Sequence, residues 1–201
     1  MHIFFILVPV LGILVSAAFF AVSVVVDRIH SIVREVGGFS SENSREDFLQ
    51  TSFDQIVACS LRIAQLNAPY RLMIEKNFDP EVRIDCHSEE IERAVTNLLV
   101  NSMRALEGNL PGTGHLALAV AAIGDRAVLH VEDDGGGIDA EVLDRIFDPF
   151  FATKPAGKGM GLGLAISYHI VKGLGGDIRV CSVPGRGTSV SVELPLAGRF
   201  Q

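Results

Sequence analysis

The strongest single constraint in this 201-residue sequence is that its first 26 residues contain no Asp, Glu, Lys or Arg. The apolar run from Ile3 to Val26 is long enough to cross a hydrocarbon layer of about 30 Å as a helix rising about 1.5 Å per residue. Two other interpretations compete with a membrane span. A signal peptide is disfavoured because Met1 and His2 supply no Lys or Arg, and a buried core helix is disfavoured because the run has no polar stripe. We predict a transmembrane helix over residues 3–26.

The charges that follow this run predict its orientation. Arg28 and Arg34 come directly after it and no Lys or Arg precedes it. Because positive residues favour the cytoplasmic side of a span, we predict a single-pass protein of the inner (cell) membrane whose remaining chain is cytoplasmic. Residues 27–36, DRIHSIVREV, place apolar side chains at helical spacing, so 27–46 is predicted to be a short amphipathic helix and a polar linker.

The charge argues against nucleic-acid binding, and the cysteines give no sign of a metal site or a disulfide framework. The formal net charge is -7 and the isoelectric point is near 5.3, whereas nucleic-acid binding requires a basic face. Nucleic acid is therefore not an expected partner. Cys59, Cys86 and Cys181 are far apart and show neither the spacing of metal ligands nor an obvious disulfide framework.

From Asp47 onward, helical and strand patterns alternate. The predicted helices cover 53–66, 88–106, 140–145 and 163–174, and the predicted strands cover 71–77, 82–86, 115–122, 127–132, 177–182 and 188–194. Helices and a mostly antiparallel sheet within one domain give an α/β two-layer sandwich. We predict that this domain covers residues 47–197.

The long helix SEEIERAVTNLLVNSMRAL carries two stripes. One stripe consists of Ile91, Val95, Leu98, Ser102 and Ala105, and the other consists of Asn97, Asn101, Arg104 and Gly108. The first stripe is predicted to pack on the sheet. The carboxamide oxygens of the second can ligand a hard cation, and Arg104 can meet phosphates that such a cation bridges. The alternative for the second stripe is a solvated or capping face.

Two acidic residues stand before three glycines in VEDDGGGI, residues 131–138. The glycines allow close backbone approach and positive φ, and the Asp133 carboxylate can accept a hydrogen bond from an exocyclic amine such as that of adenine. The alternative is a glycine-rich turn with two solvated aspartates. Asp134 beside Asp133 adds like-charge repulsion unless a cation or a helix N-terminus is near.

A third glycine-rich segment, GKGMGLGLAISYHIV, begins at Gly157 and leads into a helix. Free N–H groups at a helix start favour phosphate oxygens. Gly159, Gly161 and Gly163 alternate, unlike the dinucleotide-binding fingerprint, and no G-K-[ST] of a phosphate loop occurs.

The residues just before this segment, IFDPFFATK at 146–154, form an apolar and aromatic patch. The patch is either a core anchor or the hinge of a lid that closes on a nucleotide. In the second case Lys154 or Lys158 would lie near the phosphates.

In this order, NLLVN, DDGGG, FDPFF, GMGLGL and GRGTSVSVELP resemble the N, G1, F, G2 and G3 boxes of the histidine kinase ATP-binding domain, within the GHKL superfamily. The resemblance covers about Asp47 to Pro195. It implies the Bergerat form of the α/β two-layer sandwich, with helices on one face of a mixed, mostly antiparallel sheet, and it implies ATP and Mg²⁺ as ligands.

The resemblance also implies residue roles. Asn97 and Asn101 match the magnesium-binding asparagines, and Asn101, Arg104 and Lys154 are the implied catalytic residues. The implied nucleotide-binding residues are Asn97, Asn101, Arg104, Asp133, Gly135, Gly137, Ile138, Phe150, Lys158, Gly159, Gly161, Leu162, Gly163 and Thr188.

One residue separates the branches of this superfamily. Its ATPases and serine kinases place a general-base Glu four residues before the N-box asparagine, where this chain has Asn97. A carboxamide cannot take a proton from water or a serine hydroxyl, so the histidine kinase branch is favoured, where the nucleophile is an imidazole.

The sequence departs from that branch because none of its six histidines lies in an H box. His30 is followed by Ser31, and Glu35 stands where Pro is usual. The segment DRIHSIVREVGGFS instead resembles the end of the second helix of a phosphoacceptor hairpin. The resemblance therefore implies transfer in trans to a histidine domain, followed by a response regulator, and it leaves room for a homodimer. The alternative is a membrane-anchored nucleotide-binding regulatory protein that has lost transfer.

Overall fold

The computed structural model describes residues 48–66, 72–107, 113–151 and 161–198. The chain divides into two compact units, 1–44 and 45–201, and every described residue belongs to the second. The predicted span at 3–26, the predicted amphipathic helix and His30 lie outside the described residues. Among the helices within those described ranges, none is long and apolar enough to cross a membrane.

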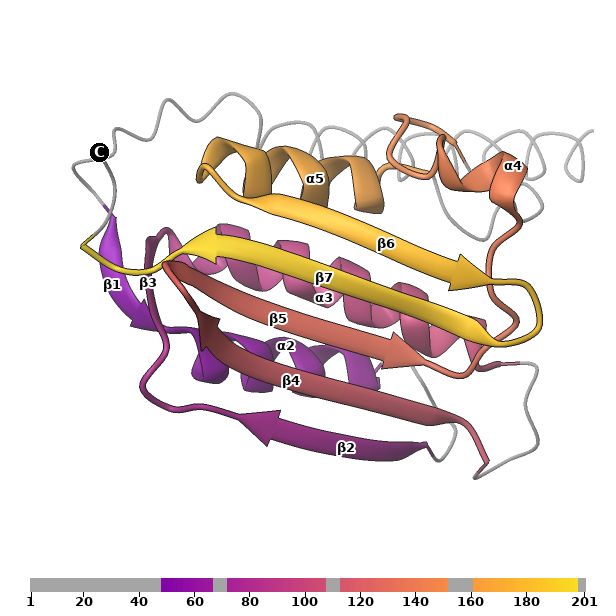
Figure 1. The fold of residues 1–201 in the computed structure, drawn as a ribbon, viewed down its shortest axis with the longest axis horizontal. Coiled ribbons are helices and arrows are strands. Elements are labelled where there is room, and N and C mark those ends of the chain that lie inside the picture. Colours follow the sequence, from indigo (N-terminus) through magenta and orange to yellow (C-terminus); the bar gives the residue numbers. More distant parts are fainter. Residues whose placement is uncertain (1–47, 67–71, 108–112, 152–160, 199–201) are drawn as a thin grey trace, which may run out of the picture. The chain divides into compact units, whose positions relative to one another are not determined.

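The main sheet has five strands in the order β2-β4-β5-β7-β6 (Figure 1). Their bounds are β2 Met73–Phe78, β4 His115–Ile123, β5 Arg126–Asp133, β6 Asp177–Val183 and β7 Gly187–Pro195. β2 pairs with β4 in parallel, and the other three pairs are antiparallel. The parallel pair requires a long crossover, which β3 (Arg83–Cys86) and α3 (Ser88–Ala105) supply. The sheet is therefore mixed, as predicted.

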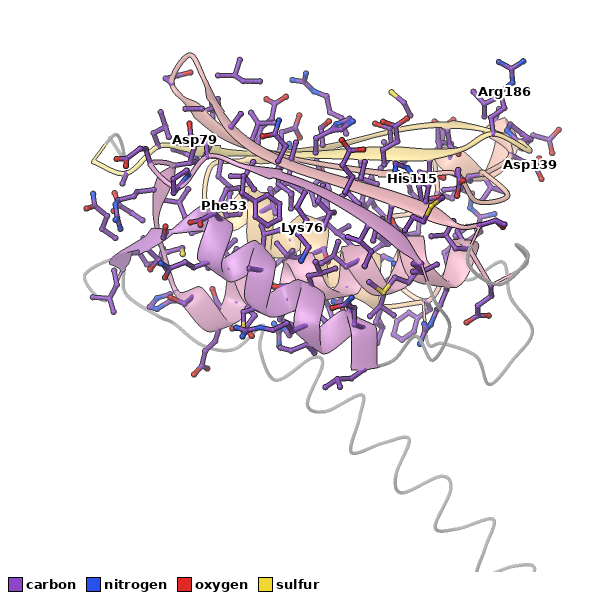
Figure 2. All side chains as sticks on the ribbon, turned by 90° about the horizontal axis from the view of Figure 1, so that it is seen from below. Phe53, Lys76, Asp79, His115, Asp139 and Arg186 are labelled. Atoms are coloured by element: carbon purple, nitrogen blue, oxygen red, sulfur yellow. The ribbon has the colours of Figure 1, made fainter. Side chains whose placement is uncertain are left out.

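Three helices cover one face of this sheet, and α2 (Phe53–Leu66), α3 and α5 (Gly163–Gly173) lie together below it in Figure 2. A short helix, α4 (Ala140–Leu143), follows β5. α5 ends at Gly173, and two residues later Gly175 has a φ of 69°, which allows the N–H of Gly176 to bond the carbonyl oxygen of Val171 at 2.9 Å. The predicted two-layer α/β architecture is confirmed.

Alternating side chains build the core. On β4, Leu116, Leu118 and Val120 are buried, and on β5 every second residue from Ala127 to Asp133 is buried. The predicted stripe of α3 faces the same core, with Ile91, Val95, Leu98 and Ser102 buried. This period-2 and helical patterning is the reason that most predicted elements agree with the structure within two residues.

One strand was not predicted. β1 (Leu49–Ser52) pairs antiparallel with β3 and forms a separate two-stranded sheet. Its sequence, LQTS, contains one apolar residue and no alternating pattern, so nothing in it indicates a strand. The N–H of Phe53, directly after β1, bonds the carbonyl oxygen of Val82, and the fully buried Phe53 side chain begins α2.

Candidate functional site

The described residues of the polar stripe of α3 lie outside its buried stripe. Asn97 is half-buried, whereas Asn101 and Arg104 are exposed. Asn97 Nδ2 donates a hydrogen bond to the carbonyl oxygen of Gly163, the first residue of α5, at 3.2 Å. This bond directs the Nδ2 end of the carboxamide to α5, so Oδ1 is the end that could ligand a cation.

A second contact fixes α5 against α3. The Ser167 hydroxyl, which is fully buried, lies 3.0 Å from the carbonyl oxygen of Ala94 and 3.0 Å from that of Gly163. The start of α5 is thereby held beside the middle of α3. The first N–H groups of α5 have no partner within their own helix, which makes this end suitable for phosphate oxygens.

Asp133 is the last residue of β5 and only 3% exposed. Its Oδ1 accepts a hydrogen bond from the N–H of Gly135 at 3.1 Å. Burial raises the pKa of Asp133, while hydrogen bonds from the Gly135 N–H, the Ser102 hydroxyl and the Thr188 N–H act to lower it. The side chain is thus a buried acceptor held by donors from three elements.

Asp134 does not share this environment. It is exposed, and its Oδ1 accepts a hydrogen bond from the N–H of His115 at 2.8 Å, at the start of β4. The two adjacent carboxylates therefore point to different surroundings, and the repulsion from Asp134 is the smallest of the effects on the Asp133 pKa. The predicted like-charge cost is therefore small in this arrangement.

Thr188 lies opposite Asp133 in the antiparallel pairing of β5 and β7, and its side chain is also buried. The preceding Gly187 has a φ of 106°, and a Cβ at this residue would lie 1.9 Å from the carbonyl oxygen of Asp133. Only glycine permits this approach. The predicted adenine-reading Asp133 and the predicted Thr188 are therefore brought together.

The glycines after Asp133 allow the G1 segment to approach its neighbours. A Cβ on Gly135 would lie 2.8 Å from Ala105 of α3, and one on Gly137, at a φ of 69°, would lie 2.2 Å from the carbonyl oxygen of Val183. The next residue, Ile138, donates its N–H to the Ser182 hydroxyl at 2.8 Å. The loop is thus held between the end of α3 and the end of β6.

Phe150 and Gly161 stand on either side of residues 152–160, which lie outside the described residues. The N–H of Phe150 bonds the carbonyl oxygen of Gly161 at 2.9 Å. Phe150 has a φ of 66° and is 68% exposed, and Gly161 has a φ of 68°. Leu162 is buried beside Gly163. Lys154, Lys158 and Gly159 lie outside the described residues, so their predicted roles stay predictions.

Three serines in this region were not assigned to the site from the sequence. Ser102 bonds Asp133 from the buried stripe of α3, where a lone hydroxyl among apolar residues was the available signal. Ser167 joins α5 to α3 from a similar apolar face. Ser182 bonds the G1 loop from β6, and only the strand register reveals this contact.

The donor set suits Mg²⁺ carried by phosphates rather than a protein-only metal centre. Within the described ranges, no group of three or more His, Cys, Asp or Glu residues could hold a metal ion. Asn97 and Asn101 supply neutral carbonyl oxygens one helical turn apart, and Mg²⁺ commonly binds through few protein ligands plus phosphates and water. The residues therefore fit a nucleotide-bound cation.

The site combines a buried acceptor, glycine-lined backbone loops, a helix start and paired carboxamides, and these groups suit a phosphate-bearing ligand with an amine donor. Residues 86–198 match the family model described as "Histidine kinase-, DNA gyrase B-, and HSP90-like ATPase". The chain belongs to this family, and its domain is the catalytic ATP-binding domain found in two-component sensor histidine kinases.

A two-component sensor and several sensor histidine kinases are similar to this chain. The chain is 41% identical over 114 residues to the two-component sensor PprA of Pseudomonas aeruginosa, covering 55% of this chain and 12% of that protein. It is 30% identical over 174 residues to the signal transduction histidine-protein kinase AtoS of Escherichia coli, covering 85% and 28%. The solved structure of the mycobacterial sensor histidine kinase MprB superposes with a TM-score of 0.65 at 27% identity, over 74% of this chain and 97% of that one. The chain therefore spans less than a third of either of these two curated relatives.

Proposed function

We propose that this chain is the ATP-binding catalytic module of a two-component sensor histidine kinase that transfers the γ-phosphoryl group of ATP to a histidine of another chain. The observation that carries the proposal is the buried acceptor Asp133 beside Thr188, with the Asn97–Gly163 contact joining α3 to the start of α5. Magnesium bound with ATP would neutralise phosphate charge, and Asn97 and Asn101 would hold it.

Each residue group would do one part of the work. Asp133 would accept a hydrogen bond from the adenine amine, and the N–H groups at the start of α5 would meet phosphate oxygens. Arg104, and Lys154 beyond the described residues, would contribute positive charge near the transferred group. Transfer also needs an imidazole in line with the γ-phosphate, oriented by a neighbouring carboxylate.

The described histidines favour an acceptor on another chain. His87 precedes α3 and stacks edge-on against Phe48, with ring centroids 4.8 Å apart. His130 lies within β5, with Nδ1 3.1 Å from the Ser191 hydroxyl. His115 lies on β4 and His169 on α5. None of these four belongs to a helix that precedes the domain, where a phosphoacceptor hairpin is expected.

The second candidate is a membrane-anchored nucleotide-binding regulatory protein without transfer, and the missing H box favours it. The two are separated by incubating the full chain, purified in detergent, with γ-labelled ATP and magnesium, with and without a complete phosphoacceptor hairpin. The kinase proposal expects little self-labelling and acid-labile labelling of the hairpin, abolished by Asn101→Ala. ATP binding with no labelled hairpin, tested across several hairpins, would favour the regulatory protein. Acid-labile self-labelling lost in His30→Gln would instead show a complete kinase acting on itself.

The membrane location is a further part of the proposal, supported by the charge-free run at 3–26. The chain is expected to fractionate with membranes and to resist carbonate extraction. Recovery of the intact chain in the soluble fraction without detergent would contradict this part while leaving ATP binding untouched.

A further inference from the structure

We propose that Ser182 is a positioning residue that sets the direction of the Thr188 hydroxyl and thereby helps the site to select adenine over guanine. This inference rests on the proposed ATP binding. Ser182 lies on β6, where the turn that joins β6 to β7 comes beside the end of β5 (Figure 1). Its hydroxyl oxygen has three neighbours, which are the N–H of Ile138 at 2.8 Å, the carbonyl oxygen of Gly187 at 2.9 Å and the Thr188 hydroxyl at 2.9 Å.

The proton count decides which hydroxyl donates. A serine hydroxyl has one proton and two acceptor lone pairs. The Ile138 N–H can only donate, so Ser182 accepts there, and the Gly187 carbonyl can only accept, so Ser182 donates its one proton there. Ser182 is then left with a lone pair for its third neighbour, and Thr188 must donate to it. Both hydroxyl directions follow from two backbone groups.

This direction determines what Thr188 can offer a ligand. With its proton committed to Ser182, the Thr188 hydroxyl presents only lone pairs. Its backbone N–H is directed to Asp133, the residue opposite it in the strand pairing. Thr188 and the Asp133 carboxylate therefore form two adjacent acceptors at the end of β5.

Two adjacent acceptors discriminate between purines. Adenine carries an amine donor at the position where guanine carries a carbonyl acceptor. The adenine amine can donate to the Asp133 carboxylate and the Thr188 hydroxyl, directly or through a bridging water. The guanine carbonyl oxygen at the same position would instead face the lone pairs of both acceptors. A buried polar site that leaves acceptors unpaired rejects the wrong ligand strongly. Loss of Ser182 would free the Thr188 proton, which could then be offered to guanine.

The test is a double-mutant cycle on the full chain in detergent. The ratio of ATP to GTP affinity is measured for the wild type, Ser182→Ala, Thr188→Val and the double variant. We expect Ser182→Ala to lower the ratio about tenfold, the effect of one hydrogen bond, and to lower it no further when Thr188 is already Val. Ser182→Thr, which keeps a hydroxyl, should restore the ratio. Ser189→Ala is the matched control, because that hydroxyl lies 3.4 Å from His130 Nε2 and should leave the ratio unchanged.

A purely structural role gives a different pattern. Ser182→Ala also removes the partner of the Ile138 N–H, so a lower melting temperature with equal losses of ATP and GTP affinity would overturn the inference. The inference would also be overturned if Ser182→Ala left the ratio of ATP to GTP affinity unchanged. It would be overturned as well if Ser182→Ala lowered this ratio equally in the wild type and in Thr188→Val. If Ser182→Ala does not fold, Ser182→Cys replaces it in the cycle, since a thiol is a weaker donor and acceptor and should also lower the ratio. A wild-type chain that binds no ATP would contradict the proposed function itself, whereas ATP selectivity that survives in Ser182→Ala contradicts only this inference.

Discussion

Asn97 Nδ2 donates a hydrogen bond to the carbonyl oxygen of Gly163, 3.2 Å away, and so joins the middle of α3 to the first residue of α5. The same side chain is a proposed magnesium ligand through its oxygen. Asn101, one turn further along α3, is exposed. Both asparagines are therefore proposed to bind the same magnesium ion, but only Asn97 makes the contact between α3 and α5 described above.

This difference predicts distinct effects of two alanine variants. Asn97→Ala should lower the free energy of unfolding by about 1 kcal/mol because it removes a part-buried hydrogen bond. Asn101→Ala should change it by less than about 0.5 kcal/mol, as is usual for an exposed position. Both should lower magnesium-ATP affinity by about tenfold. Denaturant unfolding and calorimetry with and without magnesium give these values.

The exposed Asn77 of β2 provides the control for these two variants. Asn77→Ala should leave both stability and magnesium-ATP affinity unchanged. Equal nucleotide affinity of wild type and Asn101→Ala in the presence of magnesium would contradict the cation assignment.

Two glycines near the start of β7 predict a contrast in stability. Gly187→Ala should destabilise the domain by about 3 kcal/mol or more, because a Cβ there would lie 1.9 Å from the Asp133 carbonyl oxygen. Gly185→Ala should cost only about 1 kcal/mol, since its φ of 74° is strained for alanine but no atom lies within 4 Å. Urea denaturation of both variants tests the contrast. Equal costs would mean that the backbone approach at Gly187 relaxes.

The fold was largely predictable because its elements are patterned. α2 begins and ends where its helical spacing predicts, and buried and accessible residues alternate over residues 115–121 of β4 and throughout β5. β1 was missed because its pairing with β3 depends on a partner far along the chain rather than on its own four residues. Local pattern predicts an element only when the element contributes a repeating face to the core.

The candidate site was predictable where motifs carry it. Asp133, Thr188 and Gly163 were identified from the resemblance, and the structure brings Asp133 to Thr188 and Gly163 to Asn97. Ser182 was not identified, because a serine on a strand has no local signal of its partners. Its role depends on the register of β6 against β7 and on the approach of the G1 loop, and neither is encoded in spacing alone.

The buried contact of Ser167 predicts a measurable link between the helices. Ser167→Ala should lower the free energy of unfolding by about 1 kcal/mol or more, because the carbonyl oxygens of Ala94 and Gly163 lose a buried donor. ATP affinity should fall with it, since this contact holds the start of α5 beside α3. Cys59→Ala is the control, because this residue lies on α2, its thiol bonds Glu92 of α3, and its loss should leave ATP affinity unchanged. Unaltered ATP affinity in a destabilised Ser167→Ala would show that α5 keeps its position without this bond.

The raised pKa of Asp133 predicts how ATP binding depends on pH. Burial shifts this pKa above its ordinary value of 3.8. Protonation removes a lone-pair acceptor for the adenine amine, so ATP affinity should fall as the pH drops through the raised pKa, beginning above the pH at which an exposed carboxylate would titrate. The stability of the ligand-free domain should depend on pH in the opposite direction. Because the folded state holds this proton more tightly than the unfolded state, the contribution of Asp133 to stability is fully present below pH 3.8 and is lost as the pH rises through the folded-state pKa.

Asp133→Asn separates this titration from the protonation of adenine itself. The variant should bind ATP more weakly at neutral pH, and its preference for ATP over GTP should be about tenfold smaller, the effect of one hydrogen bond. Its ATP affinity should show only the pH dependence of the nucleotide, measured by calorimetry from neutral to acidic pH. In the wild type, the free energy of unfolding should fall as the pH rises from 3.8 through the raised pKa of Asp133. The variant should not show this fall. Identical pH profiles of ATP binding in the two proteins would mean that Asp133 does not contact the base in its ionised form.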